Sequence, residues 1–136
     1  MNKSKGFTII ELIVVIAIIA ILAAIVLVNV TVYINKAKDA AIKSDIANIA
    51  LGMGSCFAAG NGVTYVGCDS NTTYVPAALA SDITAKSSAP TYSTSTTAYC
   101  VSAPLASSAS TYICADSTGV TKSSGTSICA ATACPN

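Results

Sequence analysis

Residues 7–28 read FTIIELIVVIAIIAILAAIVLV, and this stretch decides how the chain is built. Only Thr8 and Glu11 interrupt its apolar character, and as an α-helix it would extend for about 33 Å. Because the hydrocarbon core of a bilayer is about 30 Å thick, the stretch predicts a transmembrane helix. Lys3 and Lys5 precede it, which predicts that the N-terminus stays in the cytoplasm and that the rest of the chain lies outside.

Two simpler interpretations of this stretch leave features unexplained. A secretory signal peptide has an apolar region of about 7–15 residues that ends at a cleavage site. Here the apolar run is longer and continues beyond the weak candidate site near Ala23 and Ala24. A plain membrane anchor does not explain Glu11, because a carboxylate within a bilayer costs several kcal/mol. Glu11 is therefore expected to have a function and a charged partner.

Residues 5–12, KGFTIIEL, closely resemble the processing site of type IV prepilins and pseudopilins. The resemblance implies that a dedicated membrane peptidase removes leader residues 1–6 by cutting between Gly6 and Phe7, and that it then methylates Phe7. It also implies that Glu11 neutralises the terminal amine of an adjacent subunit. Both roles make physical sense, because a buried amine needs a close opposite charge and a glycine backbone can enter a protease cleft closely.

The apolar stretch also departs from many members of that family. They carry a Pro near its end and a Gly in its middle, whereas this chain has VLVNV at residues 26–30 and only Ala among its small residues further back. We expect either that the helix stays continuous in a filament or that Asn29 and Thr31 form its weak point.

An amphipathic helical half, residues 35–59, is predicted to continue from the apolar half, residues 7–34. Apolar residues recur there at steps of three or four, which defines one helix face: Ile42, Ile46, Ile49, Met53 and Phe57. We expect this stripe to pack under a small sheet. The polar residues expected to be solvated are Lys36, Lys38, Asp39, Lys43, Asp45 and Asn48. Gly60-Asn61-Gly62 predicts the end of the helix.

Residues 61–136 form a Ser/Thr-rich head in which an antiparallel sheet is expected. Segments 98–102 (AYCVS) and 111–115 (TYICA) are predicted to be paired strands. A turn at 116–119 would lead to a third strand around 120–122. The predicted fold class is α+β, with a long N-terminal helix packed on a small antiparallel sheet and disulfides to staple it.

The six cysteines are expected to form disulfides, because an even number in a small polar domain is typical of oxidising compartments. Cys100 and Cys114 hold the same place in the two predicted strands, which favours a bond between them. Cys56–Cys68 would pin the loop after the helix and Cys129–Cys134 would close a small C-terminal loop, among 15 possible pairings. The family resemblance also favours a closed C-terminal loop such as Cys129–Cys134, although the family's usual loop is longer. Such staples would compensate for the small core of the head.

Two segments of the head raise the question of glycans. The Ser/Thr-rich segment 87–97 is interpreted as a solvated variable loop, with a glycan-bearing surface as the alternative. Asn71-Thr72-Thr73 matches an N-glycosylation sequon, a pattern that is common by chance.

The composition argues against catalysis and against nucleic-acid binding. The chain is 53% hydrophobic and 10% charged, and it has no His, the commonest general base and metal ligand. No basic run is present, so contact with nucleic acid is not expected. No C-x-x-C pair suggests a zinc site. We therefore predict no enzyme activity, no cofactor and no metal.

The resemblance implies a structural subunit of a type IV pilus-like filament. Its partners would be copies of itself, the prepilin peptidase and methylase, an inner-membrane assembly platform, and the membrane before assembly. The precursor would span the bacterial cytoplasmic membrane once, and the filament would lie on the cell surface. The alternatives are a type II secretion pseudopilin and a membrane-tethered adhesin or minor tip pilin. Pseudopilins often bind calcium in an acidic C-terminal loop, whereas no acid follows Asp116 here, which favours a pilus subunit.

Overall fold

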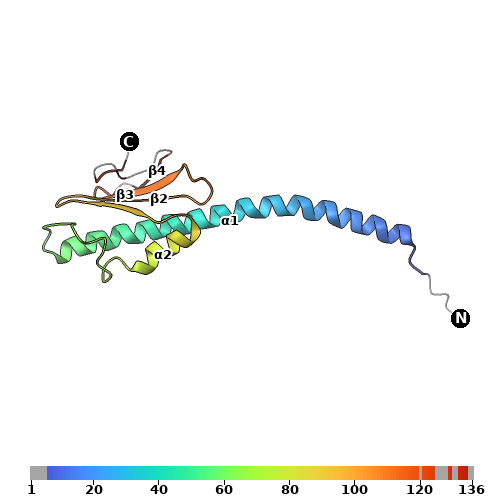
Figure 1. Ribbon diagram of the computed structural model, residues 1–136, viewed down its shortest axis with the longest axis horizontal. Coiled ribbons are helices and arrows are strands. Elements are labelled where there is room, and N and C mark those ends of the chain that lie inside the picture. The colour runs from blue at the N-terminus through green and yellow to red at the C-terminus, as the bar shows by residue number, and fades with distance from the viewer. Residues whose placement is uncertain (1–5, 120, 125–128, 130–131, 135–136) are drawn as a thin grey trace. The chain divides into compact units, whose positions relative to one another are not determined.

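The computed structural model describes residues 6–119, 121–124, 129 and 132–134. In chain order the elements are α1 (Ile9–Ala59), α2 (Ala77–Lys86), β1 (Thr91–Thr94), β2 (Tyr99–Pro104), β3 (Tyr112–Asp116) and β4 (Thr121–Ser124), as Figure 1 labels them. The chain divides into two compact units, residues 1–34 and residues 35–136, and α1 contributes to both. The predicted α+β class, with a long N-terminal helix, an antiparallel sheet and disulfides, is confirmed.

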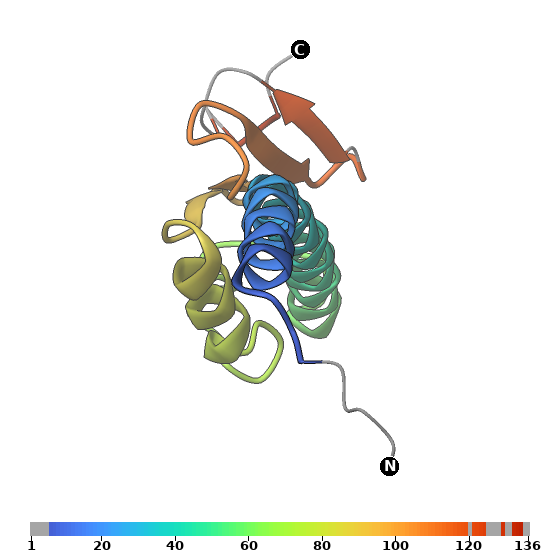
Figure 2. The same ribbon diagram turned by 90° about the vertical axis from the view of Figure 1, so that its right-hand side faces the viewer.

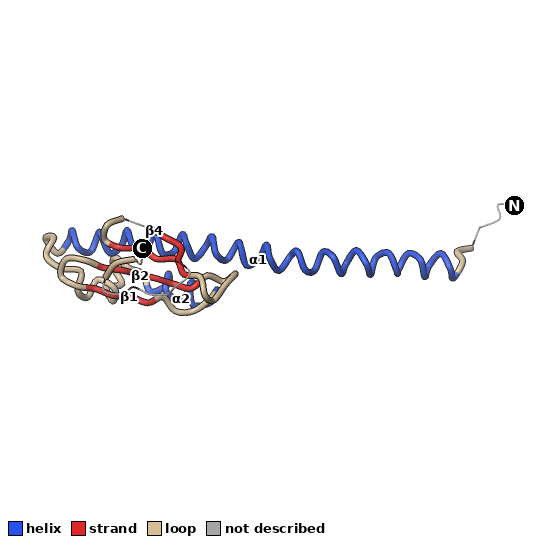
Figure 3. Tube along the Cα trace, turned by 90° about the horizontal axis from the view of Figure 1, so that it is seen from above, coloured by secondary structure: helices blue, strands red, loops and turns tan. Residues whose placement is uncertain are grey.

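The four strands form one antiparallel sheet in the order β1-β2-β3-β4 (Figure 3). The two strands predicted as a pair are β2 and β3, in which Val101 lies opposite Ala115. The predicted turn follows β3: Gly119 N donates to Asp116 O at 3.0 Å, and Gly119 has a φ of 79°, which favours glycine. The third predicted strand is β4.

β1 corrects the interpretation of segment 87–97 as a solvated loop. Thr91–Thr94 pairs with β2 as the outer strand of the sheet, and Tyr92 packs against the core. Thr and Tyr fit a half-buried pleated surface well, and this strand preference was obscured by the Ser/Thr-rich composition around it.

α2 was not predicted from the sequence, although signals for it are present. Pro76 comes directly before the helix, where its fixed φ suits a helix start. Leu79 and Ile83, four residues apart, share one helix face, and Ile83 is fully buried. Asp82 and Lys86 form an ion pair at the same spacing.

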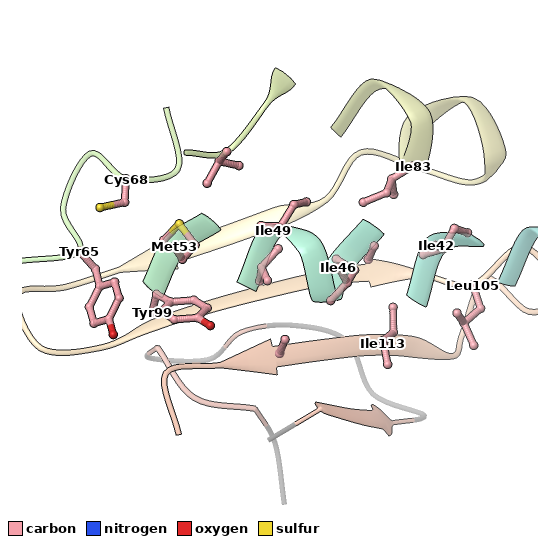
Figure 4. Packing of buried hydrophobic residues seen from close by; sticks show 14 residues of the cluster. Ile42, Ile46, Ile49, Met53, Tyr65, Cys68, Ile83, Tyr99, Leu105 and Ile113 are labelled. Atoms are coloured by element: carbon pink, nitrogen blue, oxygen red, sulfur yellow. The ribbon is translucent and has the colours of Figure 1, made fainter. Parts of the chain in front are cut away.

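The core lies between the second half of α1, the sheet and α2. The sheet covers one side of this half of α1 and α2 covers another (Figure 2). The predicted stripe is confirmed, because Ile42, Ile46, Ile49 and Met53 have no exposed surface and the last member, Phe57, is partly buried against the same core. Figure 4 shows Ile83 of α2 approaching these residues from one side and Ile113 of β3 from the other.

Two aspartates of α1 were wrongly expected to be solvated. Asp39 is only 9% exposed, and it accepts hydrogen bonds from Ser107 N (3.1 Å) and from the Ser107 hydroxyl. Asp45 Oδ2 is buried and lies 3.8 Å from Lys86 Nζ of α2. Asp39 comes three residues before Ile42 and Asp45 three residues after it, so both lie on the stripe face rather than beside it.

One of the three predicted disulfide pairs is confirmed, and the other two are wrong. Cys56 pairs with Cys68 as predicted. Cys100–Cys114 and Cys129–Cys134 are wrong, because the structure joins Cys100 to Cys129 and Cys114 to Cys134.

Cys100 and Cys114 lie close together but are joined to other partners. Cys100 is opposite Asp116 and Cys114 is opposite Ser102, so the two are diagonal neighbours, with their Sγ atoms 3.2 Å apart. They alternate with core residues such as Val101 and therefore point to the outer face of the sheet, where they form a cluster with Cys129. The two disulfides thus tie the C-terminal segment to that face.

Candidate functional site

The candidate site begins with the residues just before α1. Gly6, Phe7 and Thr8 are exposed and lie outside regular structure, and Phe7 is 77% exposed. A Cβ atom added at Gly6 would meet nothing within 4 Å. The folded chain therefore makes no demand of its own for glycine at this position. The leader cleavage at Gly6–Phe7 and the methylation of Phe7 remain predictions.

Thr8 and Glu11 form a reciprocal cap at the start of α1. Thr8 N and Thr8 Oγ1 donate to Glu11 Oε2 at 2.8 and 2.7 Å, and Glu11 N lies 3.3 Å from Thr8 Oγ1. This is a capping box, in which a hydroxyl residue and a carboxylate three positions later satisfy the free N–H groups of a helix start. The pattern Thr-x-x-Glu at residues 8–11 is the signal in the sequence that could have revealed it.

The cap determines where the Glu11 carboxylate lies. It is folded back toward the helix start, and negative charge is favoured there by the helix dipole. Oε2 is held by Thr8, whereas Oε1 has no hydrogen-bond partner among the described residues. One oxygen of the carboxylate is therefore positioned, and the other is open to a further donor.

The first half of α1 carries a large exposed apolar surface. From Ile9 to Ile34, the large hydrophobic side chains that the structure describes are between 44% and 78% exposed. Among the described residues, α1 is the one helix that is long and apolar enough to cross a membrane, judged by length and composition. Each such side chain gains roughly 1.5–3 kcal/mol when it leaves water, so this surface strongly favours a lipid or protein environment.

Asn29 is a polar residue within this apolar half. Its Nδ2 donates to Ile25 O at 3.2 Å, so part of the amide is satisfied by the backbone of its own helix. α1 is continuous through Asn29 and Thr31. Whether these residues form a weak point in a filament remains a prediction.

Two features of the head that could suggest chemistry, a cysteine cluster and a tyrosine with a shifted pKa, hold the fold together. One cluster of potential metal ligands is found there, Cys100, Cys114 and Cys134, and all three are held in disulfides. Burial, followed by the charges of Tyr65 and Asp116, raises the pKa of Tyr99 to about 12. Its hydroxyl donates to Ala50 O at 3.2 Å, so Tyr99 ties the sheet to α1 as a neutral group.

Fold and site together define a protein with a capped apolar helix suited to a membrane and a disulfide-stapled α+β head. Residues 1–27 match the family model of the prokaryotic N-terminal methylation motif. The chain therefore carries the prepilin-type signal of type IV pilins and pseudopilins, which is a signal of structural proteins rather than of enzymes. Comparisons with curated proteins and with solved structures give no match.

Proposed function

We propose that this chain is the structural subunit of a type IV pilus-like filament, made from a membrane-inserted precursor. The observation that supports it most is the Glu11 carboxylate, positioned by Thr8 at the start of an exposed apolar helix and within the matched motif. Prepilin peptidase would hydrolyse the Gly6–Phe7 bond, and methylation would follow at the new amine of Phe7.

The cut creates a positive charge that needs a partner. In a bundle of apolar helices, an unpaired amine or carboxylate would cost several kcal/mol, because each loses its hydration. The open Oε1 of Glu11 can accept a hydrogen bond from the Phe7 amine of a neighbouring subunit while Thr8 holds Oε2. Pairing of these two charges would set the stagger between adjacent helices.

The apolar half of α1 supplies the packing surface for such a bundle. In lipid, helices associate through close packing of small side chains rather than through the hydrophobic effect. Ala17, Ala20 and Ala24 recur at steps of three and four on one face of α1, and Ala20 and Ala24 have the spacing that lets two helices approach closely. The heads would then form the filament surface.

The head is suited to the outside of the cell. Three disulfides join all six cysteines, and such bonds persist in oxidising compartments. The precursor would therefore span the cytoplasmic membrane with its head outside, where an assembly platform in that membrane extracts it into the filament.

Replacing Gly6 tests this proposal directly. Because a Cβ atom added at Gly6 would meet nothing within 4 Å, Gly6→Val should leave the head folded and block the cut, so the chain keeps residues 1–6 and stays in the membrane fraction. Gly54→Ala, another exposed glycine with open space around it, is the matched control and should be processed and assembled. Normal fibres built from Gly6→Val subunits would refute the proposal.

A secretion pseudopilin is the second candidate. The composition favours a pilus, since no acid follows Asp116 to build a calcium loop. Asp116 itself is occupied: Oδ1 accepts from Thr118 N at 2.9 Å, and Oδ2 accepts from Cys134 N at 3.0 Å. Labelling of this chain along long surface fibres would support a pilus subunit. Labelling confined to the cell envelope would favour a pseudopilin, and labelling at fibre tips would favour a minor tip pilin or adhesin.

A further inference from the structure

We propose that Asn71 is the attachment site of an N-linked saccharide. The sequence Asp69-Ser70-Asn71-Thr72-Thr73 lies in the loop between α1 and α2, which the Cys56–Cys68 disulfide pins to the end of α1. The inference rests on the proposed function only in requiring that the head reaches the outside of the cytoplasm.

The geometry at Asn71 goes beyond a match of sequence pattern. Asn71 Oδ1 accepts a hydrogen bond from Thr73 N at 3.1 Å, which fixes which end of the side-chain amide is oxygen. Nδ2 has no hydrogen-bond partner among the described residues. Asn71 is partly exposed, and Thr72 and Thr73 are exposed. The acceptor amide nitrogen is therefore not engaged by a described group, and the residue that carries the sequon hydroxyl, Thr73, is exposed.

The backbone holds this arrangement in place. The carbonyl of Asn71 accepts from Tyr74 N at 3.1 Å and from Val75 N at 2.8 Å, and Asn71 N donates to Cys68 O at 3.2 Å. The acceptor side chain is thus presented on an ordered turn beside a disulfide rather than within a helix or a strand.

The same hydrogen bond helps the chemistry. An amide nitrogen is a poor nucleophile, and a donor on Oδ1 lowers the cost of removing a proton from Nδ2. In the transfer, Nδ2 forms a bond to the anomeric carbon of a glycosyl diphosphate donor. The bond from that carbon to the diphosphate oxygen breaks, the diphosphate leaves with the electron pair, and a base of the transferase takes one Nδ2 proton.

The surroundings suit a sugar and a transferase. A hollow of about 350 Å³ lies against Asn71, and Thr64, Val66 and Tyr74 are part of its wall. The wall thus includes both an aromatic and a hydroxyl residue, Tyr74 and Thr64, which suits the mixed apolar and polar character of a sugar ring. Asp69, two residues before Asn71, offers a carboxylate that a cationic group of a transferase could pair with.

The Ser/Thr-rich segment is the less favourable site for a glycan. Its residues Thr91–Thr94 form β1 and are paired with β2, so the transferase would meet a strand of the sheet there. The sequon at Asn71 lies in a loop instead.

The test uses the chain isolated from the cells that produce it, whether from membranes or from fibres. Trypsin should release residues 44–86 as one peptide, because Lys43 and Lys86 bracket it. We expect this peptide to carry a saccharide mass in the wild type and in Thr73→Ser and Thr72→Val, and to lose it in Thr73→Val and Asn71→Gln. Thr73→Val keeps the backbone donor to Asn71 and removes only the hydroxyl, so a folding defect should not explain its loss.

Three results would overturn the inference: an unmodified mass for peptide 44–86, a modification that persists in Asn71→Gln, or a saccharide on residues 87–122 instead. Because the mass is read on precursor and processed chain alike, a failure here is separate from a failure of filament assembly.

Discussion

Replacing Gly52 with alanine should destabilise the head, although alanine is the better helix former. Gly52 lies in α1 under the loop that leads to α2. An added Cβ atom would be 2.2 Å from Tyr74 O, 3.0 Å from Tyr74 C and 3.2 Å from Val75 Cγ2. The first two contacts are with backbone, so no rotation of a side chain can relieve them.

The loop has little freedom to move away. Val75 is 4% exposed within the core, and Tyr74 N and Val75 N both donate to Asn71 O. Overpacking of this kind costs about 1–3 kcal/mol, and here the contact is severe. Removing a helical glycine returns at most about 1 kcal/mol. We therefore expect Gly52→Ala to lower the free energy of unfolding by about 1–2 kcal/mol.

Gly54→Ala is the matched control, because it lies in the same turn of the same helix and a Cβ there meets nothing within 4 Å. It should raise the free energy of unfolding by about 0.5–1 kcal/mol. The assay is denaturant unfolding of the unreduced full chain in detergent micelles, followed by tyrosine fluorescence. Tyr65 stacks on Phe57 with ring centroids 4.2 Å apart, so its signal reports the head. Equal stability of the two variants would refute the close approach of Tyr74.

Three further predictions follow from other parts of the chain. Glu11→Gln should be cleaved at Gly6 but fail to enter fibres, and equal fibre yields from wild type and Glu11→Gln would exclude the charge pairing. Thr8→Val should weaken the start of α1 by about 1 kcal/mol and assemble less well than wild type. Tryptic digestion without reduction should release residues 123–136 joined to residues 87–122, and two separate peptides with internal disulfides would instead restore Cys100–Cys114 and Cys129–Cys134. Because burial raises the folded-state pKa of Tyr99 to about 12, the unfolded state ionises first, near pH 10. Stability should fall as the pH rises between these values, and Tyr99→Phe should remove much of that slope in pH-dependent unfolding, whereas an unchanged slope would contradict the assignment to Tyr99.

The features predicted correctly depend on neighbours in the sequence. The apolar stretch, the stripe through Ile42 and Ile46, and the strands around Cys100 and Cys114 are periodic patterns of a few residues. Such patterns determine which face of an element is apolar, so the core could be anticipated before any partner was known.

The features missed were of two kinds. α2 and β1 had local signals, Pro76 with Leu79 and Ile83 for the helix and Thr91-Tyr92 for the strand, but the Ser/Thr-rich surroundings obscured them. The Thr8–Glu11 cap was also readable from the sequence. The hydrogen-bond partner of Asp39 was not, because Ser107 lies 68 residues away.

The sequence by itself determined the N-terminal part of this protein: the methylation motif over residues 1–27, an apolar helix of membrane length, and a carboxylate at Glu11 near its start. These are local properties, since residue type and spacing along one helix are enough to specify them. The tertiary structure alone decided how the sheet is stapled, whereas Cys56–Cys68 could be predicted from the sequence. Cys100 and Cys114 both point to the outer face of the sheet, and their partners depend on where the C-terminal segment brings Cys129 and Cys134. That placement arises from the fold of the whole head, and no short stretch of sequence contains it.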